Sequence, residues 1–500
     1  MDRLTQVRSS KREQRYRRFF QIVDEVAEEI QAHRWAETGT TKRRVRGEQL
    51  QKLRASVETL IRDSVAVVYQ RKRKGDAPIH LNTNWYSSSV GPVELTYNIH
   101  VKRAYLGMVE LGYLEETQPG YYDRSGQKGG QKKNRLTRYG ATNRLIDKFT
   151  KEEQEVFPVI VPPAMDHASI RVRIKQDDDS EEVLLAPNTV EVREMAVKLA
   201  RINAVLASRW YDLHIPDTEL ADLQAQLAND EKDPKPLALH RRILHRVFND
   251  RDLKTGGRFY GGWWQNVPKA YRRHLIVNGK RMVEMDYSNL HPAILYAQEG
   301  IAPPEDCYRG IFDCEVEARH GDELRSMVKA AFNAMLNAEN TLRQVPRDIE
   351  PKRFGMTWKD VSTAIMSAHQ PIAHHFYTGA GKRLQRIDSD VAERTMLDFI
   401  DHGIAILPIH DSFLVHDGHG GRLEDTMQKA LREVCGVKTK LKLVQPDLSR
   451  VLAKLEEERR MDPDGFGPET SQDICEILAS RDGYDKRLDA FYAMANAKDT

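Results

Sequence analysis

The amino-acid sequence predicts an α/β (α+β) protein built from several domains. The chain has 500 residues, which is more than one compact core usually holds and suggests roughly two to four domains. Hydrophobic residues make up 40% and aromatic residues 8% of the chain, enough to form folded domains. Between residues 256 and 455, short apolar runs typical of strands alternate with amphipathic helical segments.

The composition argues against membrane insertion and secretion. No stretch approaches the roughly eighteen apolar residues of a membrane span, and residues 1–20 lack the apolar core of a signal peptide. The four cysteines are scattered and form no CxxC pair. We therefore expect a cytoplasmic protein with no membrane partner, no zinc ribbon and no disulfide framework.

Charge is distributed unevenly along the chain. Residues 1–150 contain 29 Lys and Arg against 17 Asp and Glu, a net charge of +12, whereas the other 350 residues contain 48 against 57, a net charge of −9. A basic segment joined to an acidic one favours a part that binds nucleic acid attached to a part with another task. A charge-rich solvated surface is the alternative.

The first 150 residues divide into two predicted parts. Residues 1–80 form a basic helical region with apolar positions at helical spacing. Residues 81–150 resemble a winged-helix domain, because a helical segment is followed by a strand, a Gly-rich basic loop and a second strand. The loop side chains expected to contact phosphates are Lys128, Lys132, Lys133, Arg135 and Arg138. A disordered basic linker over 123–138 is the alternative.

The remaining chain divides into four predicted segments. Residues 151–190 form a β-rich connector, since IRVRIK alternates apolar and charged residues as a half-exposed strand does. Residues 191–250 show helical periodicity, and residues 251–460 form the mixed α/β region. A Pro- and Gly-containing break at 461–469 begins a C-terminal tail, 461–500, with a short helix.

Two aspartates stand at the ends of apolar runs in the mixed region. A strand ends at Asp286 and a helix begins a few residues later, while Asp411 interrupts a run that otherwise predicts two buried strands joined by a tight turn. A carboxylate in such a place is costly unless it is paired or binds a cation. The two are 125 residues apart and can converge on one site for two Mg²⁺ ions, or for Mn²⁺. A purely structural role for either aspartate is the alternative.

A helix rich in alanine and other apolar residues is predicted between the two aspartates. Arg325, Lys329, Asn333 and Asn337 recur every four residues along it and so share one slowly drifting face. Two cations and two amides on one face suit a triphosphate and its base. The exposed face of an ordinary amphipathic helix is the alternative.

Together these three elements resemble right-hand nucleic-acid polymerases, most closely family-A DNA polymerases and single-subunit phage-type RNA polymerases. The family patterns D-Y-S-x-I-E, R-x-x-x-K-x-x-x-F-x-x-x-Y-G and V-H-D-E correspond to Asp286-Tyr287-Ser288, Arg325 with Lys329, and His410-Asp411. Segments similar to the family's T-G-R, Q-N-I-P and M-Q-G-T-A-A-D are Thr255 to Arg258, Gln265 to Pro268, and Leu384-Gln385 with Asp388 to Ala392. The resemblance implies a polymerase palm and fingers within 251–460, preceded by a helical thumb-like region at 191–250.

The resemblance also implies a role for each matching residue. Asp286 and Asp411 would be catalytic metal ligands, with the carbonyl of Tyr287 as a further ligand. Arg325 and Lys329 would bind the triphosphate, and Lys329 would also assist the leaving pyrophosphate. The residues expected to contact primer or template are His410, Arg258, Gln265, Asn266, Arg272, Arg273 and Gln385.

The departures from the family pattern bear on the nucleotide site. Asn333 and Asn337 stand where the family has its aromatic and its tyrosine, so Phe332 or Met335 is expected to supply the stacking platform. His291 occupies the position that governs sugar choice; its bulk favours deoxynucleotides, although its ring could also hydrogen-bond a 2′-hydroxyl. Motif C reads His-Asp-Ser-Phe, the form found in phage-type RNA polymerases.

These features predict a template-directed nucleotidyltransferase whose partners are a DNA primer and template, or RNA, and nucleoside triphosphates. A DNA polymerase is favoured, without proofreading because no set of N-terminal carboxylates resembles an exonuclease. An RNA polymerase or primase is the first alternative, and a non-catalytic DNA-binding protein with a degenerate palm is the second.

Overall fold

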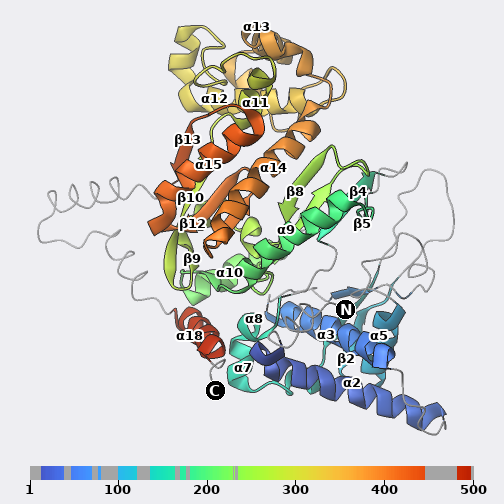
Figure 1. Cartoon of the computed structure of the whole chain (residues 1–500). Helices are drawn as coiled ribbons and strands as arrows, with labels where there is room; N and C mark the ends of the chain where they lie inside the picture. The colour runs from blue at the N-terminus through green and yellow to red at the C-terminus, as the bar shows by residue number, and fades with distance from the viewer. Residues whose placement is uncertain are drawn as a thin grey trace, which may run out of the picture.

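The structure is a computed structural model in which residues 13–38, 47–69, 77–79, 81, 99–120, 136–163, 169–175, 181–228, 230, 235–444 and 481–496 are described. Helices and strands are mixed in it, as the sequence predicts, with an N-terminal helical part below a central sheet and a helical part above it (Figure 1). None of the described helices combines the length and the apolar character needed to cross a lipid bilayer.

Three long helices build the N-terminal part. They are α2 (Arg17–Thr38), α3 (Gly47–Tyr69) and α5 (Ile99–Glu110). On α2 the residues Phe19, Val23, Val26 and Ile30 recur at intervals of three or four and are all buried. This spacing places them on one face, which packs into a core shared with α3 and α5.

A three-stranded sheet completes the N-terminal part. Its strands β1 (Ala77–Ile79), β2 (Leu114–Gln118) and β3 (Thr137–Ala141) are antiparallel and lie in the order β1-β3-β2. Helix, strand and strand thus follow in the order expected for residues 101–138. Arg138 lies on β3 opposite Pro78 and Gln118. The other predicted loop contacts, Lys128, Lys132, Lys133 and Arg135, lie outside the described residues.

The N-terminal core does not end at residue 150. Three short helices follow β3: α6 (Asn143–Ile146), α7 (Lys151–Glu155) and α8 (Phe157–Ile160). The rings of Phe149 and Phe157 meet edge to face at 5.0 Å, and both belong to the N-terminal core together with Val161. The predicted boundary at 150 therefore cuts through one core, because the β-rich pattern of the connector begins only after this aromatic contact.

A four-stranded sheet joins segments that the sequence predicts to be separate. Its order is β5-β4-β7-β8, with β4 and β7 parallel and the other pairs antiparallel. The strands are β4 (Ile170–Lys175), β5 (Glu181–Leu185), β7 (His245–Phe248) and β8 (Gly256–Tyr260). This sheet crosses the boundaries predicted at residues 190 and 250.

The prediction that residues 191–250 are helical is only partly right. The helices α9 (Val190–Ala207) and α10 (Asp217–Ala228) lie there, but so do β7 and β6 (Tyr211–Leu213). Strands of three and four residues are too short to show a period of two, so the helical periodicity around them dominates the sequence pattern. Because β6 pairs with β9, this segment contributes an edge strand to the central sheet.

The central sheet carries both aspartates. Its order is β11-β12-β10-β9-β6, and β13 pairs with β10. The strands are β9 (Leu275–Val277), β10 (Lys280–Tyr287), β11 (Ile406–Ile409), β12 (Ser412–His416) and β13 (Leu441–Val444). The helices α14 (Ala380–Asp401) and α15 (Gly420–Cys435) run along this sheet (Figure 1).

The upper part is helical and carries the segment between the two aspartates (Figure 1). It contains α11 (Leu290–Gln298), α12 (Cys314–Asn337) and α13 (Trp358–Ala368). Short 3₁₀ helices lie at Trp263–Asn266, Lys269–His274, Pro351–Phe354, Gln370–His375 and Asp417–His419. Phe332 and Val328 on α12 are fully buried and join it to the main core.

Within the predicted tail, the described residues form α18 (Asp482–Asn496), which packs beside α7, α8 and α10. Arg487 reaches Asp212 on β6 with two hydrogen bonds of 2.8 and 3.0 Å. Since the two side chains are only 4% and 0% exposed, this ion pair is buried and fixes the C-terminal helix to the sheet edge.

Candidate active site

Asp286 and Asp411 lie on neighbouring strands of the central sheet. Asp286 is the second-last residue of β10 and pairs in register with Ser412, the first residue of β12. Ile409 pairs with Ser412, so His410 and Asp411 form a two-residue hairpin turn, in which His410 has a φ of +59°. The predicted tight turn between two strands is confirmed. Through the β10–β12 pairing it places Asp411 at the same end of the sheet as Asp286.

The electrostatic surroundings of Asp286 are unfavourable to a bare carboxylate. Burial, then the negative charge of Asp411, raise its pKa to about 7, against the opposing charge of Lys329. Its Oδ1 atom is buried and has no hydrogen-bond partner among the described residues. Carboxylate oxygens are hard donors, and a divalent cation such as Mg²⁺ would satisfy the unpartnered Asp286 oxygen, so the residues fit the predicted ions.

A third acidic residue lies on the same face of β10. Glu284 is 6% exposed and stands two residues before Asp286. Its Oε1 accepts hydrogen bonds from Ser412 Oγ at 2.8 Å and from Arg272 Nη1 at 3.0 Å. Arg272, which was expected to contact nucleic acid, is thus engaged with this buried carboxylate. Glu284 also adds to the negative charge that raises the pKa of Asp286.

Arg325 and Lys329 share a face of α12, as predicted. Their cationic groups stand over the ring of Tyr308, 5.4 and 5.9 Å from its centroid. Lys329 is close enough to Asp286 to oppose the rise of its pKa. Arg325 donates from Nε to Asp306 Oδ2 at 2.7 Å. Both cations therefore lie beside the Tyr308 ring, and Lys329 is the one whose charge acts on Asp286.

The predicted stacking role of Phe332 is wrong. Its side chain is 0% exposed and packs edge to face against Tyr308, His369 and Phe376, so it cannot present a ring to a base. Asn333 is half-buried and Asn337 is exposed, and Asn337 donates to the Asn333 carbonyl at 2.8 Å. The polar stripe and Phe332 diverge because adjacent helical residues point about 100° apart.

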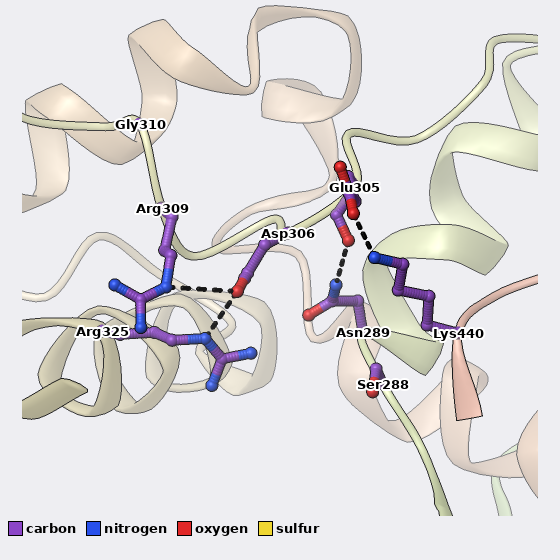
Figure 2. A pocket seen from close by; sticks show the side chains of 8 residues that line it. All are labelled: Ser288, Asn289, Glu305, Asp306, Arg309, Gly310, Arg325 and Lys440. Atoms are coloured by element: carbon purple, nitrogen blue, oxygen red, sulfur yellow. Dashed lines mark hydrogen bonds and ion pairs between the residues drawn. The ribbon is translucent and has the colours of Figure 1, made fainter. Parts of the chain in front are cut away.

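A pocket of about 530 Å³ opens beside the end of β10 (Figure 2). Ser288 and Asn289 line one side, and Arg325 with the loop residues Asp306 and Arg309 line the other. Of the predicted triphosphate ligands, Arg325 lies in this pocket whereas Lys329 is not among its lining residues.

His291 and Arg258 meet at one buried carboxylate. His291, on the first turn of α11, contacts Asp388 Oδ2 through Nε2 at 2.9 Å. Arg258, on β8, donates to the same oxygen from Nη2 and from Nε, the latter at 3.2 Å. Asp388 lies on α14 and is 4% exposed. The two residues predicted to meet the sugar and the nucleic acid are therefore held by a side chain to which the sequence assigned no role.

Gln265 and Asn266 brace the backbone around the site. Gln265 Nε2 donates to the carbonyls of Phe259 and Pro408 at 2.9 and 3.2 Å, and Asn266 Nδ2 donates to the carbonyl of Pro236 at 3.1 Å. Because Pro408 is in β11, Gln265 ties β8 to the strand that leads into Asp411. This bracing role was not predicted for either amide.

The other predicted contacts lie around the site. The Tyr287 hydroxyl donates to the Met427 carbonyl at 2.7 Å, which buries the side chain against α15. Arg273 is exposed and donates to His274 Nε2 at 3.0 Å. The exposed ring of His410 meets that of Tyr260 at 5.9 Å. Gln385 lines a second pocket of about 650 Å³ together with Tyr260 and Asn337.

Three acidic residues of the site were not singled out from the sequence. Glu284 carried a signal, since it stands two residues before Asp286 and strand periodicity puts both on one face. Asp388 stands in the segment similar to M-Q-G-T-A-A-D, but no role was assigned to it. Asp306 carried no signal, because an acidic residue in a loop is usually solvated. Their partners are 97 and 19 residues away in the chain, so only the fold reveals the contacts.

Comparisons with known proteins give limited information. No family model matches the chain, and no curated protein matches it in sequence. Among solved structures, the chain is similar to the POL domain of Pol1 from M. smegmatis, in complex with DNA primer-template and dNTP. The similarity has a TM-score of 0.30 at 16% sequence identity and covers 45% of this chain. It spans half (50%) of the length of that solved chain.

Proposed function

We propose that this chain is a template-directed nucleotidyltransferase. The observation that carries the proposal is the pair Asp286 and Asp411 at adjacent strand ends, with a buried Asp286 oxygen that has no partner among the described residues. In the proposed reaction a 3′-oxygen forms a bond to the α-phosphorus of a nucleoside triphosphate. The bond from that phosphorus to the β-phosphate breaks, pyrophosphate leaves, and the hydroxyl proton is released to solvent.

The chain would divide the work among the residues around the pair. Asp286 and Asp411 would hold two Mg²⁺ ions, or Mn²⁺, and the carbonyl of Tyr287 would be a further ligand. Divalent cations bound there supply Lewis-acid activation of the hydroxyl and stabilise charge on the phosphates. Lys329, whose charge already acts on Asp286, would neutralise charge on the leaving pyrophosphate. Arg325 would bind the triphosphate from the adjacent pocket.

We favour deoxynucleotides as substrates and DNA as template and primer. The supporting feature is the position of His291, whose ring is held by a buried aspartate instead of turning freely. A fixed imidazole beside the sugar of the incoming nucleotide would exclude a 2′-hydroxyl by its bulk. The family-A resemblance of the motifs supports the same choice, and no residues resembling a proofreading exonuclease were found in the sequence.

A single-subunit RNA polymerase or primase is the second candidate. The feature that favours it is Ser412, which gives motif C its phage-type form. Its hydroxyl is committed to Glu284 at 2.8 Å, so the serine has a defined structural partner in this chain. A degenerate palm without activity is the remaining alternative, and the same assay tests it.

The test is extension of a labelled primer on a template by the full chain with Mg²⁺ and either dNTPs or rNTPs. We expect extension with dNTPs, and loss of extension by Asp411→Ala and by the near-isosteric Asp411→Asn. The matched control is Asp417→Asn, which neutralises a largely exposed aspartate six residues further on. Circular dichroism would show that each variant is folded.

The outcomes separate the candidates. Extension only with rNTPs would replace the DNA polymerase by the RNA polymerase. No extension with either nucleotide set, or equal extension by wild type and Asp411→Asn, would remove the proposed active site.

A further inference from the structure

The pocket beside β10 contains more cations than the sequence motifs predict. Besides Arg325, Arg309 and Lys440 line it, and all three side chains enter from different segments (Figure 2). Arg309 is in the loop after α11, Arg325 is on α12, and Lys440 directly precedes β13. Three cations on three segments around a cavity of about 530 Å³ are a setting for a compact polyanion.

The pocket is tied to the paired aspartates through the sheet. In the β10–β13 pairing Asp286 faces Lys442, and just beyond it the Ser288 N–H donates to the Lys440 carbonyl at 2.8 Å. Ser288 is the first residue after β10 and follows Asp286 by two positions, a span of about 7 Å in extended chain. A polyphosphate whose first phosphate lies beside a cation held by Asp286 would therefore bring its next phosphates to Ser288 and Lys440.

Each of the three cations already has an anionic partner. Arg325 contacts Asp306 at 2.7 Å, and Lys440 pairs with Glu305. Arg309 pairs with the exposed Asp322 through Nη2, and its Nε lies 3.7 Å from the same Asp306 oxygen. Glu305 and Asp306 are adjacent in the loop and lie between the cations (Figure 2). Burial alone would raise the pKa of Asp306, but the hydrogen bond from Arg325 holds this pKa below its usual value. Asp306 is thus charged at neutral pH.

We propose that this pocket is a polyphosphate site in which Glu305 and Asp306 stand in for phosphate groups until a polyphosphate displaces them. This inference rests on the proposed function for its biological meaning, but not for the binding itself. The residues it adds to the predicted triphosphate ligands are Arg309 and Lys440 as binding groups and Glu305 and Asp306 as internal competitors.

Displacement of the carboxylates by phosphate is favourable for two physical reasons. The Lys440–Glu305 pair is 66% and 77% exposed, and exposed pairs of this kind contribute little stability. Arginine, in contrast, binds phosphate through short charge-assisted and often bidentate hydrogen bonds, and a polyphosphate carries more negative charge than two carboxylates. When no polyphosphate is bound, the hydrogen bond to Asp306 holds the Arg325 side chain at the pocket.

An unsatisfied buried acceptor supports a ligand in the same place. Asn289 is 6% exposed and lines the pocket, and its Nδ2 donates to the Glu305 carbonyl at 3.2 Å. Its Oδ1 atom is buried without a hydrogen-bond partner among the described residues. A water molecule that enters with a hydrated polyphosphate would supply the missing donor.

The polyphosphate has two chemical sources, the tail of an incoming nucleoside triphosphate and the pyrophosphate released by the reaction. Calorimetric titration of the full chain in EDTA, without primer, measures binding independently of the paired aspartates. The probes are inorganic tripolyphosphate, pyrophosphate, dATP and dAMP. Pocket-dependent binding strongest for dATP assigns the incoming tail, whereas binding strongest for pyrophosphate assigns the product.

Substitutions of opposite sign make the test specific. Arg309→Gln should weaken tripolyphosphate binding about tenfold, because it removes a charge-assisted contact. Asp306→Asn should strengthen binding severalfold, since it removes the competing charge while Asn can still accept from the Tyr308 N–H, now at 3.0 Å. The matched controls are Arg353→Gln and Glu323→Gln, which break an exposed ion pair of 2.9 Å outside the pocket. Neither control should change binding.

The inference and the proposed function fail in different ways. If primers are extended but neither Arg309→Gln nor Asp306→Asn alters tripolyphosphate binding, the pocket assignment is overturned and the polymerase stands. If both variants shift binding as expected but no nucleotide is incorporated, the pocket stands and the proposed reaction is overturned. Weaker binding by Asp306→Asn would overturn the idea of an internal competitor.

Discussion

Asp388 accepts a hydrogen bond from His291 at 2.9 Å, and this contact links the start of α11 to the buried face of α14. The same carboxylate holds Arg258, so one buried carboxylate orients two side chains, one on strand β8 and one on helix α11. A histidine fixed in this way presents one ring edge to the site. Its orientation is then a property of α14 as much as of α11.

The first prediction concerns sugar selectivity. If the fixed ring of His291 excludes a 2′-hydroxyl, His291→Ala should raise ribonucleotide use about tenfold relative to deoxynucleotide use. Asp388→Asn, which weakens the hold on the ring, should change the ratio in the same direction. The measurement is kcat/KM for dNTP and rNTP in primer extension.

A double-mutant cycle provides the control for this prediction. Because Asp388 would act through the ring of His291, the double variant should be no less selective than His291→Ala alone. Effects that add, or an unchanged ratio in His291→Ala, would show that the ring is not the sugar gate.

The second prediction concerns the C-terminal helix. Arg487 and Asp212 are 4% and 0% exposed, so Arg487→Met should cost about 3–5 kcal/mol in the free energy of unfolding by leaving a buried carboxylate unpaired. The neighbouring Lys486 pairs with Glu155 at 2.6 Å, and both are 54% exposed. Lys486→Met should therefore leave the free energy of unfolding almost unchanged.

Urea denaturation followed by circular dichroism measures both changes. The double variant Arg487→Met/Asp212→Leu should recover part of the loss, because it removes both charges from the interior. An equal cost for Arg487→Met and Lys486→Met would mean that α18 is not fixed to β6 by this pair.

The sequence predicts the secondary structure around the site well, because local patterns determine it. Apolar runs predict the strands that carry Asp286 and flank Asp411, and helix-forming residues predict α12 with its polar stripe. The predictions fail where the exposure of a side chain depends on residues far away in the chain. Phe332 lies one residue from the polar stripe, and only the packing of α12 against Phe376 and His369 shows which face is buried.

Long-range contacts explain what the sequence could not give. Ser412 and Glu284 are 128 residues apart, and His291 and Asp388 are 97 residues apart, so no local sequence pattern predicts either contact. The same holds for β6 and β7, which are too short to show strand periodicity and gain their partners from distant strands. The motifs identify the candidate side chains, whereas the fold supplies the residues that contact and orient them.

The third prediction follows from the pKa of Asp286, which burial and Asp411 raise to about 7. A raised carboxylate pKa means that the folded state loses stability as pH increases from about 4 to about 7, because over this range the unfolded carboxyl releases its proton while the buried one keeps it. A divalent cation offsets that charge. Added Mg²⁺ should therefore raise Tm more at pH 8 than at pH 6, and EDTA should abolish the difference.

Asp286→Asn tests the origin of this effect. Without metal the variant should be more stable than the wild type at pH 8, since it removes a buried charge that Asp411 repels, and its Tm should respond little to Mg²⁺. A wild-type Mg²⁺ response that is equal at the two pH values would contradict the raised pKa.

The fourth prediction concerns Glu284, whose negative charge also raises the pKa of Asp286. Glu284→Gln keeps an oxygen that can accept from Ser412 and Arg272 but removes the charge. Ionisation of Asp286 then becomes easier, so its pKa falls. The acidic limb of the pH–rate profile for primer extension should move to lower pH by a few tenths of a unit to about one unit. The exposed Glu323→Gln is the matched control and should leave the limb in place. A shift of the limb to higher pH in Glu284→Gln would mean that Glu284 serves Asp286 by holding Arg272 and Ser412 in position and that its charge is not the dominant influence.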